Sequence, residues 1–157
     1  MKYLQEIADM LTTLNFKIST VESCTGGLLS SKLTDISGSS SFITLNLVTY
    51  ANEAKEKMLG VEINQDGVVS ESCSYQMAKG LYKLTNSDIC ISTTGIAGPT
   101  GGTKNKPVGL MYSTIYAKNK FKNYKIQVDK SLGRIKTKEE FVKKVLENLY
   151  HFLKNEI

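Results

Sequence analysis

The 157-residue chain has one histidine, three cysteines, two prolines and no tryptophan. Any hydrolase site of the Ser-His or Cys-His kind would have to use His151, since no other imidazole is present. That residue ends an expected helix, where a packed or solvated side chain is the simpler interpretation. Cys24, Cys73 and Cys90 are odd in number and widely spaced, so they indicate neither a disulfide framework nor a zinc site. Reduced thiols fit a cytoplasmic location.

Long hydrophobic runs are also missing. No run approaches the ~20 apolar residues of a membrane-spanning helix, and residues 1–15 lack the apolar centre of a signal peptide. The length falls within the roughly 100–200 residues of one domain, and 41% of the residues are hydrophobic. We therefore expect a single domain over residues 1–157, located in the cytoplasm and without a membrane partner.

Positive charge is concentrated near the C-terminus. The net charge is +5, and residues 118–157 hold 11 basic but only 5 acidic side chains. A basic segment can bind nucleic acid. An expected hairpin carries Lys118, Lys120, Lys122 and Lys125, however, and lysines there commonly protect the edge of a sheet from aggregation. We favour this second interpretation and do not expect a nucleic-acid partner.

Hydrophobic periodicity predicts alternating helices and strands. Helices are expected over 2–14, 28–36, 53–59, 71–84 and from Thr137 onward, the last with Phe141, Val145, Leu149 and Phe152 on one face. Strands are expected over 17–21, 44–50, 89–94, 108–116 and 121–128. Asn52 and Ser70 are the expected N-caps of their helices. The pattern predicts an α/β fold, a three-layer α/β/α domain with a mixed β-sheet.

The turn Glu22-Ser23-Cys24-Thr25-Gly26-Gly27 joins an expected strand to an expected helix. Open α/β sheets bind ligands at such strand ends, and the N–H groups of a following helix can hold a phosphate or an oxyanion. The two glycines would let a substrate approach the backbone closely. An ordinary strand–helix turn capped by a threonine explains the same spacing, and both interpretations stay open.

Tyr50 and Lys55 form the second candidate site, at a strand end and in the first turns of the next helix. Without a usable histidine, a serine nucleophile needs another base, and a lysine whose pKa is lowered by burial can take that part. A phenol such as that of Tyr50 could orient either partner. The alternative is that Glu53 and Lys57 form a surface ion pair and that Lys55 is merely solvated.

The third candidate is the irregular stretch 95–107, which holds both prolines and Gly95, Gly98, Gly101 and Gly102. It matches neither the phosphate-loop pattern G-x-x-x-x-G-K-[ST] nor the dinucleotide pattern G-x-G-x-x-G. Its glycines allow the tight curvature of an anion-binding nest. A flexible surface loop is the alternative.

Four segments together resemble one family. They are E-S-C-T-G-G at 22–27, D-I-S-G-S-S at 35–40, V-T-Y-A-N-E-A-K at 48–55, and G-I-A-G-P-T-G-G at 95–102 followed by K-P-V-G at 106–109. This combination is similar to the CinA C-terminal domain, the nicotinamide mononucleotide (NMN) deamidase family, in its stand-alone form. The resemblance implies hydrolysis of the NMN carboxamide to nicotinic acid mononucleotide and ammonia, in the recycling of pyridine nucleotides, with no metal or organic cofactor.

Position by position, the resemblance makes Ser23 the nucleophile, Lys55 the general base and acid, and Tyr50 the residue that supports this pair. Cys24 is the chemical rival of Ser23. The expected substrate contacts are Thr25, Gly26, Gly27, Thr94, Gly95, Gly98 and Arg134. Arg134 and the loop at 95–102 are the candidates for the phosphate, although Leu132 and Gly133 stand where the family has Gly-Asp before the arginine.

The resemblance also implies a homodimer. The expected helices 71–84 and 137–153 have apolar faces that fit either an interface or the core. Two other functions stay open: a catalytically silent nucleotide-binding or regulatory module, and a basic DNA-associated protein of the competence and DNA-damage class. The joint presence of Ser23, Tyr50 and Lys55 argues against the first, and the second would require salt-dependent binding to duplex DNA.

Overall fold

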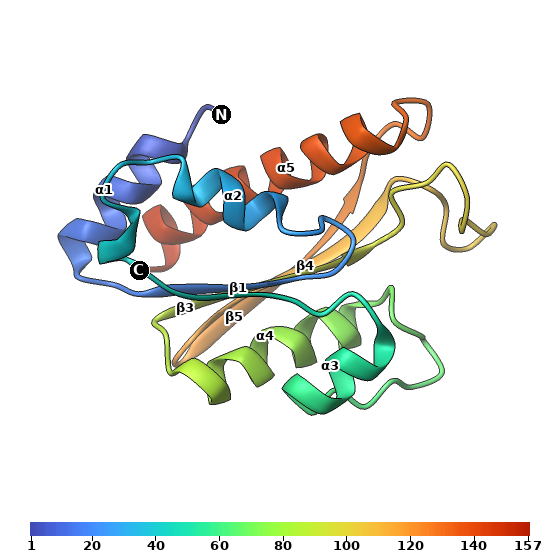
Figure 1. The fold of residues 1–157 in the computed structure, drawn as a ribbon, viewed down its shortest axis with the longest axis horizontal. Coiled ribbons are helices and arrows are strands. Elements are labelled where there is room, and N and C mark those ends of the chain that lie inside the picture. The colour runs from blue at the N-terminus through green and yellow to red at the C-terminus, as the bar shows by residue number, and fades with distance from the viewer.

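The computed structural model describes residues 1–157 as a twisted five-stranded sheet with helices on both faces (Figure 1). The strands lie in the order β2-β1-β3-β4-β5. β1 pairs in parallel with β2 and β3, whereas the β3–β4 and β4–β5 pairs are antiparallel. The bounds are β1 Ile18–Glu22, β2 Ile43–Val48, β3 Ile89–Gly95, β4 Leu110–Ala117 and β5 Lys120–Gln127. The predicted α/β fold with a mixed sheet is confirmed.

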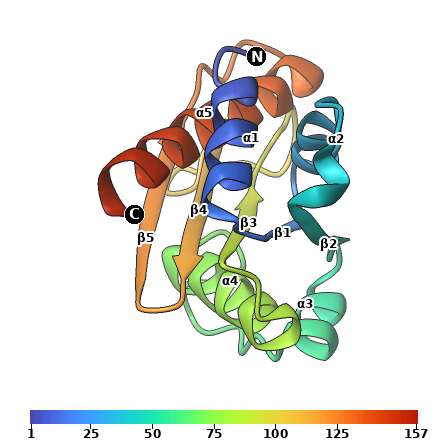
Figure 2. The ribbon, with the colours of Figure 1, turned by 90° about the vertical axis from the view of Figure 1, so that its left-hand side faces the viewer.

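Helices form a layer on each face of this sheet. One face carries α1 Leu4–Leu14, α2 Leu28–Thr34 and α5 Arg134–Glu156, and the other carries α3 Asn52–Leu59 and α4 Glu71–Thr85 (Figure 2). A short 3-10 helix, η1 Ser39–Ser41, precedes β2. No helix combines the length and the apolar character needed to cross a membrane.

Two helices begin earlier than the sequence predicts. The N-cap of α3 is Ala51, whose extended backbone and carbonyl start the helix, so the prediction of Asn52 as N-cap is wrong. Helix α5 begins at Arg134 rather than Thr137, because Gly133 adopts a φ of 85° and its carbonyl accepts the Thr137 N–H at 2.9 Å. Ser70 does cap α4, as predicted, by accepting the N–H of the third helical residue.

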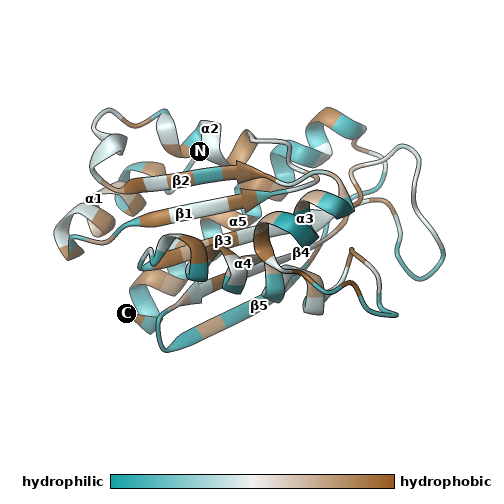
Figure 3. Cartoon of the chain, turned by 60° about the horizontal axis from the view of Figure 1, so that its bottom comes forward, coloured by the Kyte–Doolittle hydropathy of each residue, from teal (hydrophilic) through white to brown (hydrophobic).

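The sheet has a polar edge at β5, which is largely hydrophilic in Figure 3. Lys120, Lys122 and Lys125 all lie exposed on this outer strand, and Lys118 lies in the turn before it. Charged side chains along an edge strand disfavour pairing with another chain. The lysines therefore lie where the edge-protection interpretation requires them.

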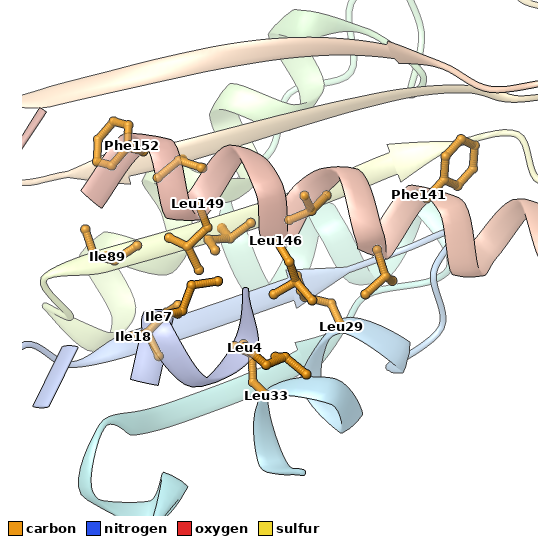
Figure 4. Packing of buried hydrophobic residues seen from close by; sticks show 14 of the residues in the cluster. Leu4, Ile7, Ile18, Leu29, Leu33, Ile89, Phe141, Leu146, Leu149 and Phe152 are labelled. Carbon is orange, nitrogen blue, oxygen red and sulfur yellow. The ribbon is translucent and has the colours of Figure 1, made fainter. Parts of the chain in front are cut away.

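The larger core lies between the sheet and the α1, α2 and α5 layer (Figure 4). Phe141, Val145, Leu149 and Phe152 of α5 are all buried there, as their spacing predicts. Each such side chain stabilises the fold by about 1.5–3 kcal/mol. A smaller cluster packs α4 against the other face, through Met77 and others. The apolar faces of α4 and α5 are therefore core.

Candidate active site

The three candidate segments meet at the carboxyl edge of the sheet. β1, β2 and β3 are parallel, so the turn after β1, the segment after β2 and the loop after β3 emerge side by side. Between them lies a cavity of about 260 Å³. The predicted site residues that line it are Ser23, Tyr50, Lys55, Thr94, Gly95, Gly98 and Arg134. No cluster of histidine, cysteine or carboxylate side chains in the chain is arranged to hold a metal ion.

Ser23 and Lys55 form the buried end of this cavity, which we call the floor. The Lys55 ammonium nitrogen lies 3.0 Å from the Ser23 hydroxyl oxygen and 3.0 Å from the Tyr50 backbone carbonyl oxygen. Ser23 is 9% exposed and Lys55 only 1%. The alternative of a solvated Lys55 is wrong, although the Glu53–Lys57 surface pair also exists, with its nitrogen and oxygen 2.6 Å apart.

Burial lowers the pKa of Lys55, because the charged amine is deprived of water. The thiols of Cys73 and Cys24 act in the opposite direction but more weakly. None of the four ion pairs in the chain involves Lys55, so no carboxylate holds its proton. An amine in these surroundings can lose its proton and act as a base toward the hydroxyl beside it.

Cys24 also lines the cavity, next to Ser23. Burial raises the pKa of its thiol to about 12, and the negative charge of Glu22 adds to this effect. A thiol with that pKa stays protonated and weakly nucleophilic near neutral pH. The surroundings therefore favour the Ser23 hydroxyl over the Cys24 thiol.

Three of the predicted substrate contacts do not line the cavity. Thr25 is fully buried, and Gly26 donates its N–H to the Ser23 carbonyl at 3.0 Å. Gly27, with a φ of 99°, is the N-cap of α2. The Glu22 carboxylate, not Thr25, accepts the N–H groups of Leu29 and Ser30 in the first turn of that helix, so the alternative of Thr25 as a helix cap is wrong. These residues shape the turn behind Ser23, and their contact with a substrate stays a prediction.

Tyr50 contributes two groups to two places. Its backbone carbonyl accepts a hydrogen bond from Lys55 at the floor. Its phenol, on a residue that is 57% exposed, accepts a hydrogen bond from Arg134 at 2.9 Å instead of contacting Ser23 or Lys55. The expected orienting group is the phenol, whereas the backbone carbonyl is the group that contacts the amine.

Arg134 closes the exposed end of the cavity, the mouth, which we define as the Tyr50 phenol, Gly98 and Arg134. The guanidinium donates to the Gly98 carbonyl at 2.7 Å as well as to the phenol. A Cβ on Gly98 would lie 2.4 Å from the Val108 side chain, and one on Gly95 would lie 2.6 Å from the Leu110 carbonyl oxygen. Close packing, and not flexibility, explains the glycines at these two positions.

A second cation, Lys138, lies beside the turn after β1 without lining the cavity. Lys138 follows Arg134 by four residues on α5, and so lies on the same face of the helix. Its ammonium nitrogen is 3.4 Å from the place where a Cβ of Gly26 would be. The signal was hidden because the sequence prediction began this helix at Thr137, which left Arg134 outside it.

Val68 and Val69, which are not among the predicted site residues, form an apolar wall of the cavity. They belong to the irregular segment between α3 and α4, where no periodicity marks a buried face. The Thr94 hydroxyl donates to the Val68 carbonyl at 2.7 Å and so fixes this wall against β3. The cavity therefore combines an apolar wall with a polar floor.

A sequence model described as the CinA C-terminal domain matches residues 1–153. A CinA-like protein from Kosmotoga olearia is 41% identical over 152 residues, which are 91% of this chain and 37% of that protein. The chain thus spans about a third of the length of the curated relatives it matches.

Solved structures agree with this assignment. The competence/damage inducible protein from Agrobacterium tumefaciens is 35% identical, with a TM-score of 0.90 over 98% of this chain and 94% of that one. A CinA superfamily protein from Enterobacter cloacae is 27% identical, with a TM-score of 0.91 over 97% and 90% of the two chains. With the order of its motifs and the arrangement of its strands in agreement, the chain belongs to the CinA C-terminal domain family.

Proposed function

We propose that this protein is an amidohydrolase that converts the carboxamide of NMN to the carboxylate, releasing ammonia and nicotinic acid mononucleotide. The observation that carries the proposal is the 3.0 Å contact between the Ser23 hydroxyl and the buried Lys55 amine, whose pKa is lowered. A hydroxyl beside a neutral amine is the arrangement of a Ser-Lys nucleophile.

The reaction begins with the neutral Lys55 amine taking the proton of Ser23 while the serine oxygen attacks the carboxamide carbon. The Cys24 backbone N–H, beside the nucleophile, is the proposed donor to the resulting oxyanion. Lys55 then gives its proton to the departing nitrogen, so that ammonia leaves and an acyl-enzyme forms. Water activated by the same amine hydrolyses the ester and restores Ser23.

The remaining groups suit the two ends of a mononucleotide. Val68 and Val69 offer an apolar wall for the pyridine ring next to the floor. Arg134 at the mouth and Lys138 one turn later on α5 offer positive charge for the phosphate. In this proposal the amide binds at Ser23 and the phosphate binds toward α5. Assembly as a homodimer and a cytoplasmic location remain proposals based on the sequence.

The proposal is tested by ammonia release from NMN, nicotinamide riboside and nicotinamide, measured with the wild type and Ser23→Ala. We expect rapid release from NMN, much slower release from the two compounds without phosphate, and none from Ser23→Ala. Ser31→Ala, on the exposed surface of α2, is the matched control and should behave as the wild type. Near-normal turnover by Ser23→Ala would contradict the mechanism.

A catalytically silent nucleotide-binding module is the second candidate. One observation favours it: the matched region is about a third of the length of each longer relative. Such a proportion is expected for a regulatory domain that accompanies another domain. It predicts that NMN binds, for example in a calorimetric titration, while no ammonia is released. Turnover that depends on Ser23 would exclude it.

A further inference from the structure

Glu22 is a fully buried carboxylate that does not line the cavity. One of its oxygens accepts the Thr25 hydroxyl at 2.6 Å and the Leu29 N–H at 2.9 Å. The other accepts the N–H and the hydroxyl of Ser30, at 2.9 and 2.6 Å. All four partners donate, so the group is anchored to both the turn and the start of α2 without any cation.

The backbone of Glu22 is fixed as well. It is the last residue of β1, paired with Val48, and its carbonyl accepts the Thr49 N–H at 2.9 Å. The only residues between this fixed backbone and the Thr25 hydroxyl that Glu22 holds are Ser23 and Cys24. Both ends of this two-residue segment are therefore fixed, one by the backbone of Glu22 and the other by its side chain. Ser23 and Cys24 then have little freedom to exchange places at the cavity floor.

Thr25 links the turn to the neighbouring strand β3. Its hydroxyl lies 2.8 Å from the Thr93 hydroxyl, and the Thr93 carbonyl accepts the Ser23 N–H at 3.1 Å. Thr25 and Thr93 are both fully buried, so these hydrogen bonds do not compete with water. The chain of contacts runs from Glu22 through Thr25 and Thr93 to the backbone of Ser23.

We propose that Glu22 is the positioning residue of this site: its carboxylate locks the 22–27 turn so that the Ser23 hydroxyl, and not the Cys24 thiol, faces the Lys55 amine. The inference rests on the proposed Ser-Lys function. Glu22 touches neither substrate nor the reacting atoms. Its negative charge also raises the pKa of Cys24, which adds a chemical reason for the thiol to remain inactive.

The test labels the two nucleophiles separately. A fluorophosphonate is used for Ser23 and iodoacetamide for Cys24, and peptide mass mapping reports the rate at each residue. Glu22→Gln puts an NH₂ group where a carboxylate oxygen accepts hydrogen bonds, so that donor faces donor. We expect the rate of Ser23 labelling and kcat on NMN to fall by about 10–100-fold, while KM changes by less than about threefold. Alkylation of Cys24 should become faster.

Thr25 provides a second test should Glu22→Gln fail to fold. Thr25→Val keeps the shape and removes the hydroxyl, so Ser23 labelling should fall about tenfold, whereas Thr25→Ser should keep the wild-type rate. Thr114→Val is the matched control, because Thr114 is fully buried and its hydroxyl also makes two hydrogen bonds, to Ser74 and Asn123, away from the cavity. It should lower the melting temperature but leave labelling unchanged.

The proposal is overturned if Glu22→Gln and Thr25→Val lose only thermal stability, as Thr114→Val does, while both labelling rates stay within twofold of the wild type. Labelling separates this result from failure of the proposed substrate. If the wild type releases no ammonia from NMN but Ser23 is still labelled, and labelled more slowly in Glu22→Gln, the substrate is wrong and the role of Glu22 stands.

Discussion

The floor and the mouth of the cavity are held in different ways. At the floor, Ser23 and Lys55 are 9% and 1% exposed, and strand ends and buried hydrogen bonds fix them. At the mouth, the Tyr50 phenol and Arg134 meet through side chains that are open to solvent. Buried polar contacts are stronger than exposed ones, which compete with water. The floor should therefore set the rate of the reaction, and the mouth its affinity for substrate.

The largest expected effect is at the floor. Lys55→Met keeps a side chain of similar length but removes the base, so kcat on NMN should fall about 10⁴-fold, as when one member of a catalytic pair is lost. Folding should be preserved, since the substitution places an apolar side chain of similar length in a buried position. Steady-state ammonia release measures the loss.

Lys57→Met is the matched control for that experiment. Lys57 lies two residues further along α3 in an exposed ion pair with Glu53, and such pairs contribute little to stability. Its turnover should equal that of the wild type. A mild loss in Lys55→Met that is recovered by raising the pH would remove Lys55 from the mechanism.

The lowered pKa of Lys55 predicts the pH dependence of the same step. The base must be neutral, so kcat/KM should fall as the pH decreases through that pKa, by about tenfold per pH unit. At pH values between this lowered pKa and the ordinary value of 10.5, Lys55 is protonated in the unfolded chain but neutral in the folded one. Its contribution therefore makes the free energy of unfolding rise with pH in this range. Urea unfolding of the wild type should show this rise relative to Lys55→Met, and parallel curves for the two would contradict it.

The sequence predicts most of the fold because the long helices have a clear apolar period. The α5 face with Phe141 and Leu149 is an example, since spacing alone identifies it. The predicted start of the same helix at Thr137 is wrong, because Gly133 adopts a positive φ as the N-cap and the helix begins at Arg134. Backbone conformation at one glycine leaves no trace in hydrophobic periodicity.

The candidate site is predictable only in part. Scarcity of histidine and the order of motifs indicate Ser23 and Lys55, and the structure brings them together. The approach of Lys138 to Gly26 depends on how α5 crosses the sheet, which no local pattern encodes. The motif also identifies Tyr50 as a site residue, but it does not show whether the backbone carbonyl or the phenol contacts Lys55.

At the mouth, removal of the guanidinium should weaken substrate binding. Arg134→Gln should raise KM for NMN about 10–100-fold with little change in kcat, since hydrogen bonds to a charged group contribute about 1.5–3 kcal/mol. Nicotinamide riboside, which lacks the phosphate, should be affected far less. Lys136→Gln, an exposed neighbour on α5 that does not line the cavity, is the control. Equal losses for both substrates would show that Arg134 does not contact the phosphate.

The smallest expected effect separates the two groups of Tyr50. Tyr50→Phe removes the phenol oxygen that Arg134 contacts and leaves the carbonyl that accepts from Lys55. One exposed hydrogen bond contributes about 1 kcal/mol, so KM should rise about fivefold while kcat stays within twofold. Steady-state kinetics on NMN measures both constants. A large fall in kcat with KM unchanged would place the phenol at the floor during the reaction, and the division between a floor that sets rate and a mouth that sets affinity would then fail at this residue.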